Sequence, residues 1–244
     1  MPVKVEKYGP IIEITEYEKT PRKVRLPSVR KGSDVYLPKR PDNIRRTKKI
    51  CLRRVLSAIE DFGNPLLVTL TFEGDASDAS YANDSLRSFQ VRLRNKYPKA
   101  ESLFIPELSP KGRIHFHGLL FNVPLCLGDT RKGRYYIPDG DERKTRVLAK
   151  LWGCGFLDAK KTDGNVRLGY YISKYIAKGG GEPLFSAMRI LRISRGMPKE
   201  IVIREGVADL VQKRYSVKKA YREWEGDNPF LGKITKKFYS NEET

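Results

Sequence analysis

The feature that most restricts the fold is a short turn between two strand-like segments in the middle of the chain. Residues 103–108 and 113–123 are rich in strand-favouring residues, and Ser109-Pro110-Lys111-Gly112 separates them. Proline suits the first position of a type I turn, and glycine adopts the left-handed backbone that completes a three-residue hairpin loop. This loop places Glu107 opposite His115. A two-residue loop would shift the register by one residue and turn Glu107 to the other face.

Helices and strands alternate on both sides of this hairpin. Residues 66–72 alternate from Val68 onward between apolar residues and threonines, which predicts a half-buried strand. Apolar spacing and capping residues predict further elements: helices over 43–62, from the 75–84 segment to about 97, 141–152 and 166–178, and a strand over 156–160. This pattern predicts an α+β fold in which a central antiparallel sheet carries helices packed on one face.

The two ends of the chain differ from this middle part. Frequent prolines and basic residues prevent long helices near the N-terminus, which indicates an extended basic arm. We therefore divide the chain into an N-terminal arm at 1–42, a main domain at 43–200 and a C-terminal helical extension at 201–244. We also expect a strand at 11–15 in the arm, a strand at 190–193 near the end of the main domain, and a helix at 208–224 in the extension.

The charge of the chain predicts a polyanionic partner. Its 48 Lys and Arg outnumber 29 Asp and Glu, which gives a net charge of +19, and residues 1–60 alone carry 16 basic against 7 acidic side chains. Nucleic acid is the usual partner of such an excess, although a solvated basic surface is the alternative. A membrane anchor is not expected, since the chain has neither an amphipathic membrane helix nor a run of ~18 apolar residues.

The three cysteines and the N-terminal residues favour the cytoplasm. Cys51, Cys126 and Cys154 form no Cys-x-x-Cys pair, and an odd number does not suit a framework of disulfides. No apolar run follows the first charges, so a secretory signal is not expected.

Both histidines of the chain lie in one predicted strand. His115 and His117 are two residues apart, so their side chains point to the same face and can offer nitrogens to one metal ion. The hairpin register adds Glu107 as a third ligand on that face. One carboxylate and two imidazoles leave positions open for phosphate oxygens, and we expect Mg²⁺ or Mn²⁺. The alternatives are two structural histidines and an exposed edge glutamate.

Tyrosines and lysines share one stripe of the predicted helix over 166–178. Tyr171, Tyr175 and Lys178 are spaced i, i+4, i+7, and Lys174 flanks them, whereas Tyr170 is rotated away. A tyrosine oxygen can attack a phosphate and form a covalent ester, provided that a metal or a lysine stabilises the charge. Each tyrosine has a lysine three residues later. Half-buried aromatics beside solvated lysines are the alternative.

Together these segments resemble the motifs of the HUH endonucleases, the rolling-circle replication initiators of plasmids and single-stranded DNA phages. The resemblance spans roughly residues 64–196 and rests on motifs that occur in the family's order: Leu67–Phe72, Glu107 with His115-Phe116-His117, and Tyr171–Lys178. Trp152–Phe156 resembles the phage and plasmid branch, and Ser194–Gly196 extends the match.

The resemblance implies a five-stranded sheet of RRM-like or ferredoxin-like type and nicking of single-stranded DNA at a replication origin. One tyrosine would keep the 5′-phosphate and release a 3′-OH primer, and the second would cut after one round. Lys178 and Lys174 would match the family's motif lysine. Which tyrosine attacks first stays open, with Tyr175 favoured if Lys178 is that lysine.

The departures from related families narrow the expected partners. Relaxases have a third ligand histidine, which this chain lacks, so the resemblance favours a replication initiator. A Gly-x4-Gly-Lys-Ser/Thr loop is also absent, so a host helicase and polymerase would assist. Tyrosine transposases share the chemistry. A non-catalytic nucleic-acid-binding protein and a phosphodiesterase that uses water are the alternatives from other classes.

Overall fold

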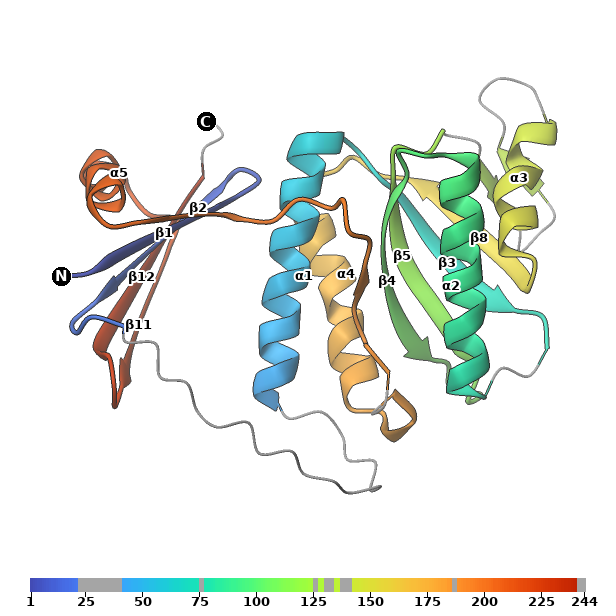
Figure 1. The fold of residues 1–244 in the computed structure, drawn as a ribbon, viewed down its shortest axis with the longest axis horizontal. Helices are drawn as coiled ribbons and strands as arrows, with labels where there is room; N and C mark the ends of the chain where they lie inside the picture. Colours follow the sequence, from blue (N-terminus) through green and yellow to red (C-terminus); the bar gives the residue numbers. More distant parts are fainter. Residues whose placement is uncertain are drawn as a thin grey trace. The chain divides into compact units, whose positions relative to one another are not determined.

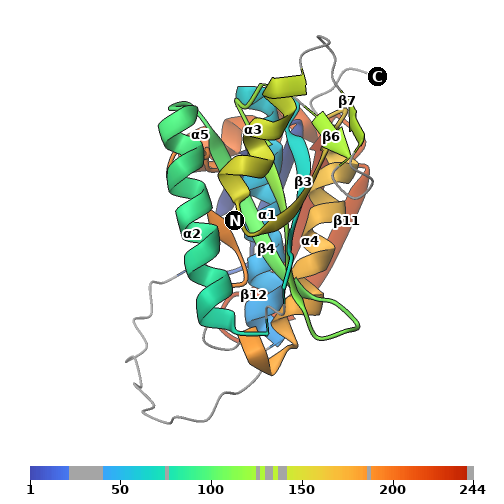
Figure 2. The ribbon, with the colours of Figure 1, turned by 90° about the vertical axis from the view of Figure 1, so that its right-hand side faces the viewer.

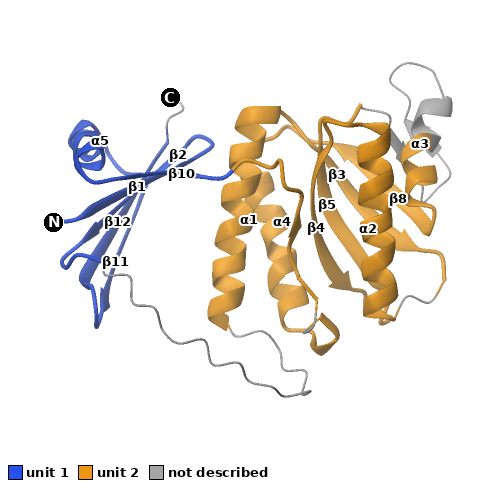
Figure 3. Cartoon of the chain, in the orientation of Figure 1, with its two compact units in different colours: residues 1–34, 199–244 blue, residues 35–198 orange. Residues whose placement is uncertain are grey.

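The computed structural model describes residues 1–21, 41–74, 77–124, 127–129, 134–136, 142–185 and 188–240. The chain forms two compact units (Figure 3). Unit 2 comprises residues 35–198, and unit 1 combines the two ends of the chain, residues 1–34 and 199–244. Each unit has its own buried apolar cluster.

Unit 2 is built on an antiparallel sheet with the strand order β7-β6-β8-β3-β5-β4-β9. The strands are β3 (Leu66–Phe72), β4 (Glu101–Leu108), β5 (Ile114–Phe121), β6 (Leu127–Asp129), β7 (Arg134–Tyr136), β8 (Gly155–Lys161) and β9 (Arg192–Ile193). The helices are α1 (Pro41–Phe62), α2 (Ala79–Lys96), α3 (Glu142–Trp152), α4 (Val166–Gly180) and the short 3-10 helix η2 (Pro183–Phe185). The chain order β3-α2-β4-β5-α3-β8 is a ferredoxin-like βαββαβ arrangement, which confirms the α+β prediction.

Helices cover both faces of this sheet, whereas the sequence predicted one. Helices α2 and α3 lie on one face, and α1 and α4 lie on the other (Figures 1 and 2). The first face buries Phe72, whose ring centroid is 5.0 Å from that of Trp152. The second face also carries fully buried apolar residues, including Ile105 and Leu119. Because these side chains must leave water as well, a second layer of helices is required.

The hairpin has the register expected from its turn. Glu107 is the partner of His115 across β4 and β5, and Gly112 has a φ of +75°. The amide of Ser109 donates to the carbonyl of Arg113 at 2.8 Å, which closes the three-residue loop. The register therefore places Glu107 on the face that carries the histidines.

Unit 1 is a five-stranded antiparallel sheet formed by both ends of the chain. Its order is β10-β1-β2-β12-β11, with β1 (Val3–Tyr8), β2 (Ile11–Tyr17), β10 (Ile201–Arg204), β11 (Arg222–Asn228) and β12 (Gly232–Ser240). Helix α5 (Gly206–Ser216) packs on β1 and β10. The apolar cluster of this unit includes Val5, Ile14, Ala208 and Tyr215.

Several local expectations for the chain ends change in the structure. The strand expected at 11–15 is present as part of β2, but β1 was not predicted. The expected helix at 208–224 ends at Ser216, and a strand begins at Arg222, so the C-terminal segment is largely strand. Of the strand expected at 190–193, only Arg192–Ile193 pairs with β4. Residues 22–40 of the arm predicted at 1–42 lie outside the described residues, and the domain boundaries remain a prediction.

Two further expectations concern the cysteines and membranes. Cys51 is fully buried in α1 and Cys154 is partly buried, both as free thiols, while Cys126 lies outside the described residues. Among the helices that the structure describes, none is both long and apolar enough to cross a membrane.

Candidate active site

Two threonines of β3 orient the two histidines of β5. The register pairs Thr69 with His117 and Thr71 with His115. The hydroxyl of Thr69 lies 3.3 Å from Nδ1 of His117, and the hydroxyl of Thr71 lies 3.0 Å from Nδ1 of His115. With Nδ1 engaged by the sheet, Nε2 is the nitrogen of each ring that is turned toward a potential ligand.

Glu107 joins the histidine strand to the tyrosine helix. One carboxylate oxygen lies 2.6 Å from Nε2 of His117, and the other accepts a hydrogen bond from Nζ of Lys178 at 2.7 Å. The Glu107 side chain is only 18 % exposed, so both contacts form in a partly dehydrated setting. The predicted register accounts for the place of Glu107 beside the histidines, whereas its contact with Lys178, far away in the sequence, was not predicted.

Helix α4 reaches the sheet through an apolar stripe and a glycine. Leu168, Ile172 and Ile176, which are four residues apart and so share one face of the helix, are buried. A Cβ atom at Gly179 would lie 2.7 Å from the carbonyl oxygen of Pro106, so only glycine permits this close approach of α4 to β4. Because Pro106 precedes Glu107 and Gly179 follows Lys178, this contact brings the ion pair together.

The two candidate nucleophiles touch each other beside the histidine strand. The ring of Tyr175 stacks on the ring of His117, with centroids 3.9 Å apart and planes inclined by 15°. The hydroxyl of Tyr175 is 2.7 Å from the hydroxyl of Tyr171, and the Tyr171 side chain is more exposed. The structure therefore brings both tyrosine oxygens to one place at the edge of the Glu107 cluster.

The two lysines of the helix differ in their contacts. Nζ of Lys178 binds Glu107 and lies 5.6 Å from the centroid of the Tyr175 ring. Lys174 is exposed, and within the described part of the chain no hydrogen bond or ion pair joins its side chain to the cluster. The same holds for Tyr170, which was expected to point elsewhere and is 44 % exposed.

Burial and charge shift the protonation of the cluster in opposing directions. Burial alone would raise the pKa of Glu107, but the hydrogen bonds and charges of Lys178 and His117 hold it below its ordinary value. Burial lowers the pKa of His117, against the opposing effect of Glu107. Glu107 raises the pKa of Lys178. At neutral pH the carboxylate is therefore charged and the imidazole neutral, which are the forms that bind metals.

The pKa of Tyr175 is raised well above its ordinary value. Burial contributes most, followed by the hydrogen bond with Tyr171 and the charge of Glu107. In this arrangement the phenol keeps its proton at neutral pH. An added positive charge beside the oxygen would be needed to make it a nucleophile.

The donor atoms fit a hard divalent cation in their chemical type. A carboxylate and two imidazoles whose Nδ1 atoms already face hydroxyl groups form an open donor set. Within the described residues, however, no three His, Cys, Asp or Glu side chains are arranged as a metal site. Glu107 instead contacts His117 directly, so a bound cation would replace this hydrogen bond.

An open cleft of about 510 Å³ gives access to these donors. Its walls include Thr69, Thr71, Glu107, His115 and His117. Pro110 of the hairpin loop and Phe156 of β8 also line it. The cleft can therefore admit a chain-like substrate to the face that holds the histidines.

Sequence reasoning did not identify Thr69, Thr71 and Gly179 as parts of the site. The signal for the threonines was present, since they alternate with the buried residues of β3 and so share the face of the histidines. The pairing of β3 with β5 was not predicted, and the threonines could be assigned only with it. For Gly179 there was no local signal beyond the end of a helix.

Comparison with known proteins points to DNA replication. Residues 65–180 match the family model described as replication-associated protein ORF2/G2P. A search of curated proteins and a search of solved structures each gave no significant match. The matched segment includes Glu107, His115, His117, both tyrosines of the cluster and Lys178. This core of unit 2 is thus similar to a family of replication-associated proteins, which is consistent with a rolling-circle replication initiator and indicates interaction with DNA.

Proposed function

We propose that this chain is a metal-dependent, site-specific endonuclease and strand-transferase of the HUH type that initiates rolling-circle replication on single-stranded DNA. The observation that carries the proposal is the stacking of Tyr175 on His117, next to the Glu107–Lys178 pair. The proposed nucleophile, the ammonium group of Lys178 and the proposed metal ligands meet there on one face of the sheet. The family match over residues 65–180 supports a role in replication.

The proposed reaction replaces one phosphate ester by another. A tyrosine oxygen forms a bond to the phosphorus of a DNA phosphodiester, and the bond from phosphorus to the 3′-oxygen breaks. The phenolic proton is released to solvent, and the departing oxygen takes up a proton to become a 3′-OH. The DNA 5′-phosphate then stays on the protein as a phosphotyrosine, so the energy of the ester is retained for rejoining.

Glu107, His115 and His117 would hold Mg²⁺ or Mn²⁺. When bound, the cation would polarise the phosphate and stabilise negative charge on the attacking oxygen. Thr69 and Thr71 keep the two imidazoles oriented by engaging Nδ1. Once Glu107 turns to the cation, Lys178 becomes available to the phosphate oxygens, because its present partner is that carboxylate.

We assign the first attack to Tyr175 and the second to Tyr171. The ring of Tyr175 stacks on His117 and has Nζ of Lys178 5.6 Å from its centroid, whereas the hydroxyl of Tyr171 contacts that of Tyr175. Since the two oxygens are 2.7 Å apart, either can approach the same phosphate without a large movement of α4. This closeness suits a strand transfer in which one tyrosine remains bonded while the other cuts.

The proposal is tested by incubating the protein with labelled single-stranded DNA that carries its replication origin, with and without Mn²⁺. We expect a metal-dependent covalent adduct that His117→Ala abolishes. The same variant should keep its salt-sensitive DNA binding, since Lys and Arg supply that affinity. Unchanged nicking by His117→Ala would refute the metal assignment. Cleavage without an adduct would indicate a phosphodiesterase that uses water, and binding alone would indicate a non-catalytic protein.

A further inference from the structure

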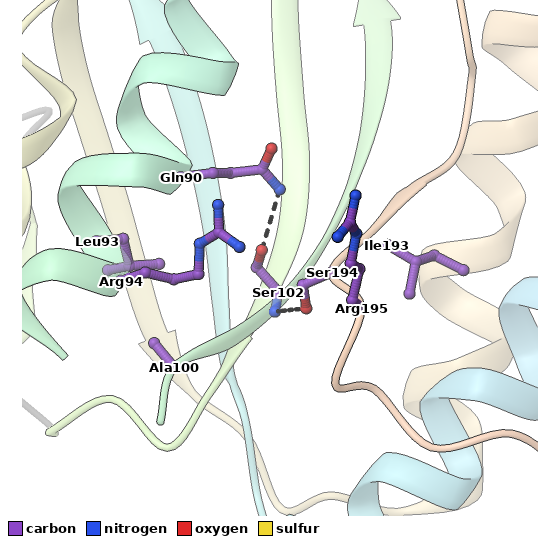
Figure 4. A pocket seen from close by; sticks show the side chains of 8 residues that line it. All are labelled: Gln90, Leu93, Arg94, Ala100, Ser102, Ile193, Ser194 and Arg195. Atoms are coloured by element: carbon purple, nitrogen blue, oxygen red, sulfur yellow. Dashed lines mark hydrogen bonds between the residues drawn. The ribbon is translucent and has the colours of Figure 1, made fainter. Parts of the chain in front are cut away.

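A second cleft of unit 2 is lined by arginines and lies away from the tyrosine cluster. A groove of about 1190 Å³ separates α2 from the segment at 183–195, and Arg87, Arg189, Arg192 and Arg195 line it. A smaller pocket of about 170 Å³ adjoins it, shares Arg195, and adds Arg94. Figure 4 shows Arg94 and Arg195 approaching this smaller pocket from α2 and from the segment after β9. Its floor includes a hydrogen bond of 3.1 Å from Gln90 to Ser102.

The arginines of this cluster have few acidic neighbours. Among the described residues, none of the five is in an ion pair, and Asp78 is the only acidic residue that lines either pocket. Asp78 is engaged at the start of α2, where it accepts from the amide of Ser80 at 2.7 Å. Asp84 acts on Arg192 through its charge, but no described carboxylate forms an ion pair with the five arginines, so most of the concentrated positive charge stays available to a ligand.

Two buried polar atoms beside the groove have no hydrogen-bond partner among the described residues. They are Nε of Arg192 and Oδ1 of Asn83, and both side chains line the groove. Burial, together with the nearby charge of Arg189, lowers the pKa of Arg192. A buried donor left unpaired costs about 1–3 kcal/mol, so a ligand that accepts its hydrogen bond removes a penalty. Guanidinium groups match phosphate oxygens in geometry.

The groove also has an apolar wall. Pro183 and Leu184 of η2, together with the largely buried Met188, line the side opposite α2. A duplex keeps its bases stacked inside and presents mainly phosphates to such a wall. A single strand, in contrast, can place unstacked bases against apolar side chains while its phosphates meet the arginines. The mixture of arginine and apolar surface therefore favours a single strand.

The groove and the tyrosine cluster are connected around one edge of the sheet. Arg192 of β9 is the strand partner of Phe104, and the ring of Phe104 packs against Phe89 of α2. The side chain of Arg192 therefore lies on the face of the sheet that α2 covers. Glu107 is three residues further along β4, or roughly 10 Å at the usual rise of a strand, but on the α4 side. Because β9 is the edge strand, a flexible chain can pass around it from one face to the other.

We infer that this arginine groove binds the sugar–phosphate backbone of single-stranded DNA next to the segment that enters the tyrosine cluster. Arg87, Arg189, Arg192 and Arg195 contact phosphates, and the η2 wall contacts bases. The groove holds DNA without reading its sequence, since phosphate contacts carry no sequence information. The choice of DNA over RNA rests on the proposed function, whereas the binding of a single strand rests on the groove itself.

The test compares two triple variants in a background in which Tyr171→Phe and Tyr175→Phe prevent cleavage. The groove variant carries Arg87→Gln, Arg189→Gln and Arg195→Gln, all at exposed positions, so folding should be preserved. The matched control carries Arg45→Gln, Arg46→Gln and Lys161→Gln, which remove the same charge from exposed positions outside the groove. Binding of an oligothymidylate of about 30 nucleotides is measured at several salt concentrations without metal.

We expect the groove variant to lower the slope of log affinity against log salt by about 2, since each phosphate contact contributes about 0.7. The control should change the slope by less than half of that. Equal effects of the two variants, or an unchanged slope in the groove variant, would refute the inference. Equally tight binding of a duplex or of oligouridylate by the parent would refute the assignment to single-stranded DNA. The binding test uses a variant that cannot cleave DNA. Its result therefore does not depend on whether the chain nicks DNA, and failure of the two proposals can be told apart.

Discussion

At the scale of single residues, Glu107 decides how the cluster is held together. Its carboxylate contacts both His117 on β5 and Lys178 on α4. Its two oxygens have different partners, so removing the carboxylate would break both the contact with His117 and the ion pair with Lys178. We therefore propose two roles for Glu107, as a metal ligand and as the anchor of Lys178.

The two lysines of α4 provide a matched pair of substitutions. We expect Lys178→Gln to lower the nicking rate by roughly a hundredfold, because one preorganised positive group beside the phosphate is lost. Lys174→Gln removes the same charge from the same helix but has no contact with the cluster, and we expect a loss of less than about fivefold. Single-turnover nicking at saturating DNA measures both. Equal losses would show that Lys178 has no special role.

The lowered pKa of Glu107 predicts how stability depends on pH. A carboxyl group with a lower pKa in the folded state contributes stability above its unfolded pKa, and this contribution is lost as the pH falls through the folded value. Without metal, Glu107→Gln should therefore lower the melting temperature at pH 7, and this difference should vanish below the folded pKa, where both side chains are neutral. Thermal unfolding from about pH 7 to pH 3 measures it. A difference that persists or grows in acid would contradict the assignment.

At the scale of elements, the site depends on the close approach of α4 to β4. The apolar stripe and the hairpin register could both be predicted, because each follows from local periodicity and turn chemistry. The contact between Gly179 and Pro106 could not, since it joins segments separated by more than 70 residues. The pairing of β3 with β5, which makes Thr69 and Thr71 part of the site, is non-local in the same way.

Two glycines at the end of α4 test this approach directly. Gly179→Ala places a methyl group against the carbonyl of Pro106, and we expect a loss of about 1–3 kcal/mol in stability together with slower nicking. Gly181→Ala is the control, because its Cβ would meet no atom closer than 3.9 Å. Denaturant unfolding and nicking assays measure both effects. If Gly179→Ala behaved like Gly181→Ala, the close contact would not position the helix.

At the scale of the whole molecule, local signals predicted unit 2 far better than unit 1. Most elements of unit 2 between residues 41 and 180 follow strong periodic patterns and lie close to the expected bounds, but the short strands β6 and β7 were not predicted. In unit 1, β1 pairs with β10 across nearly the full length of the chain. No local pattern reveals such a partner, and the basic, proline-containing N-terminal segment suggested an arm. The net charge of +19 agrees with a DNA partner but does not locate the surface that binds it.

The central claim is that the chain forms a phosphotyrosine bond to DNA within the cluster of Glu107, His117 and Lys178. The most direct measurement is peptide mapping by mass spectrometry after reaction with origin DNA and Mn²⁺. We predict that the nucleotide is attached to Tyr175, that it moves to Tyr171 in Tyr175→Phe, and that Tyr170→Phe changes nothing. A nucleotide on Tyr170 or on a residue outside α4, or no attached nucleotide despite cleavage, would contradict the account.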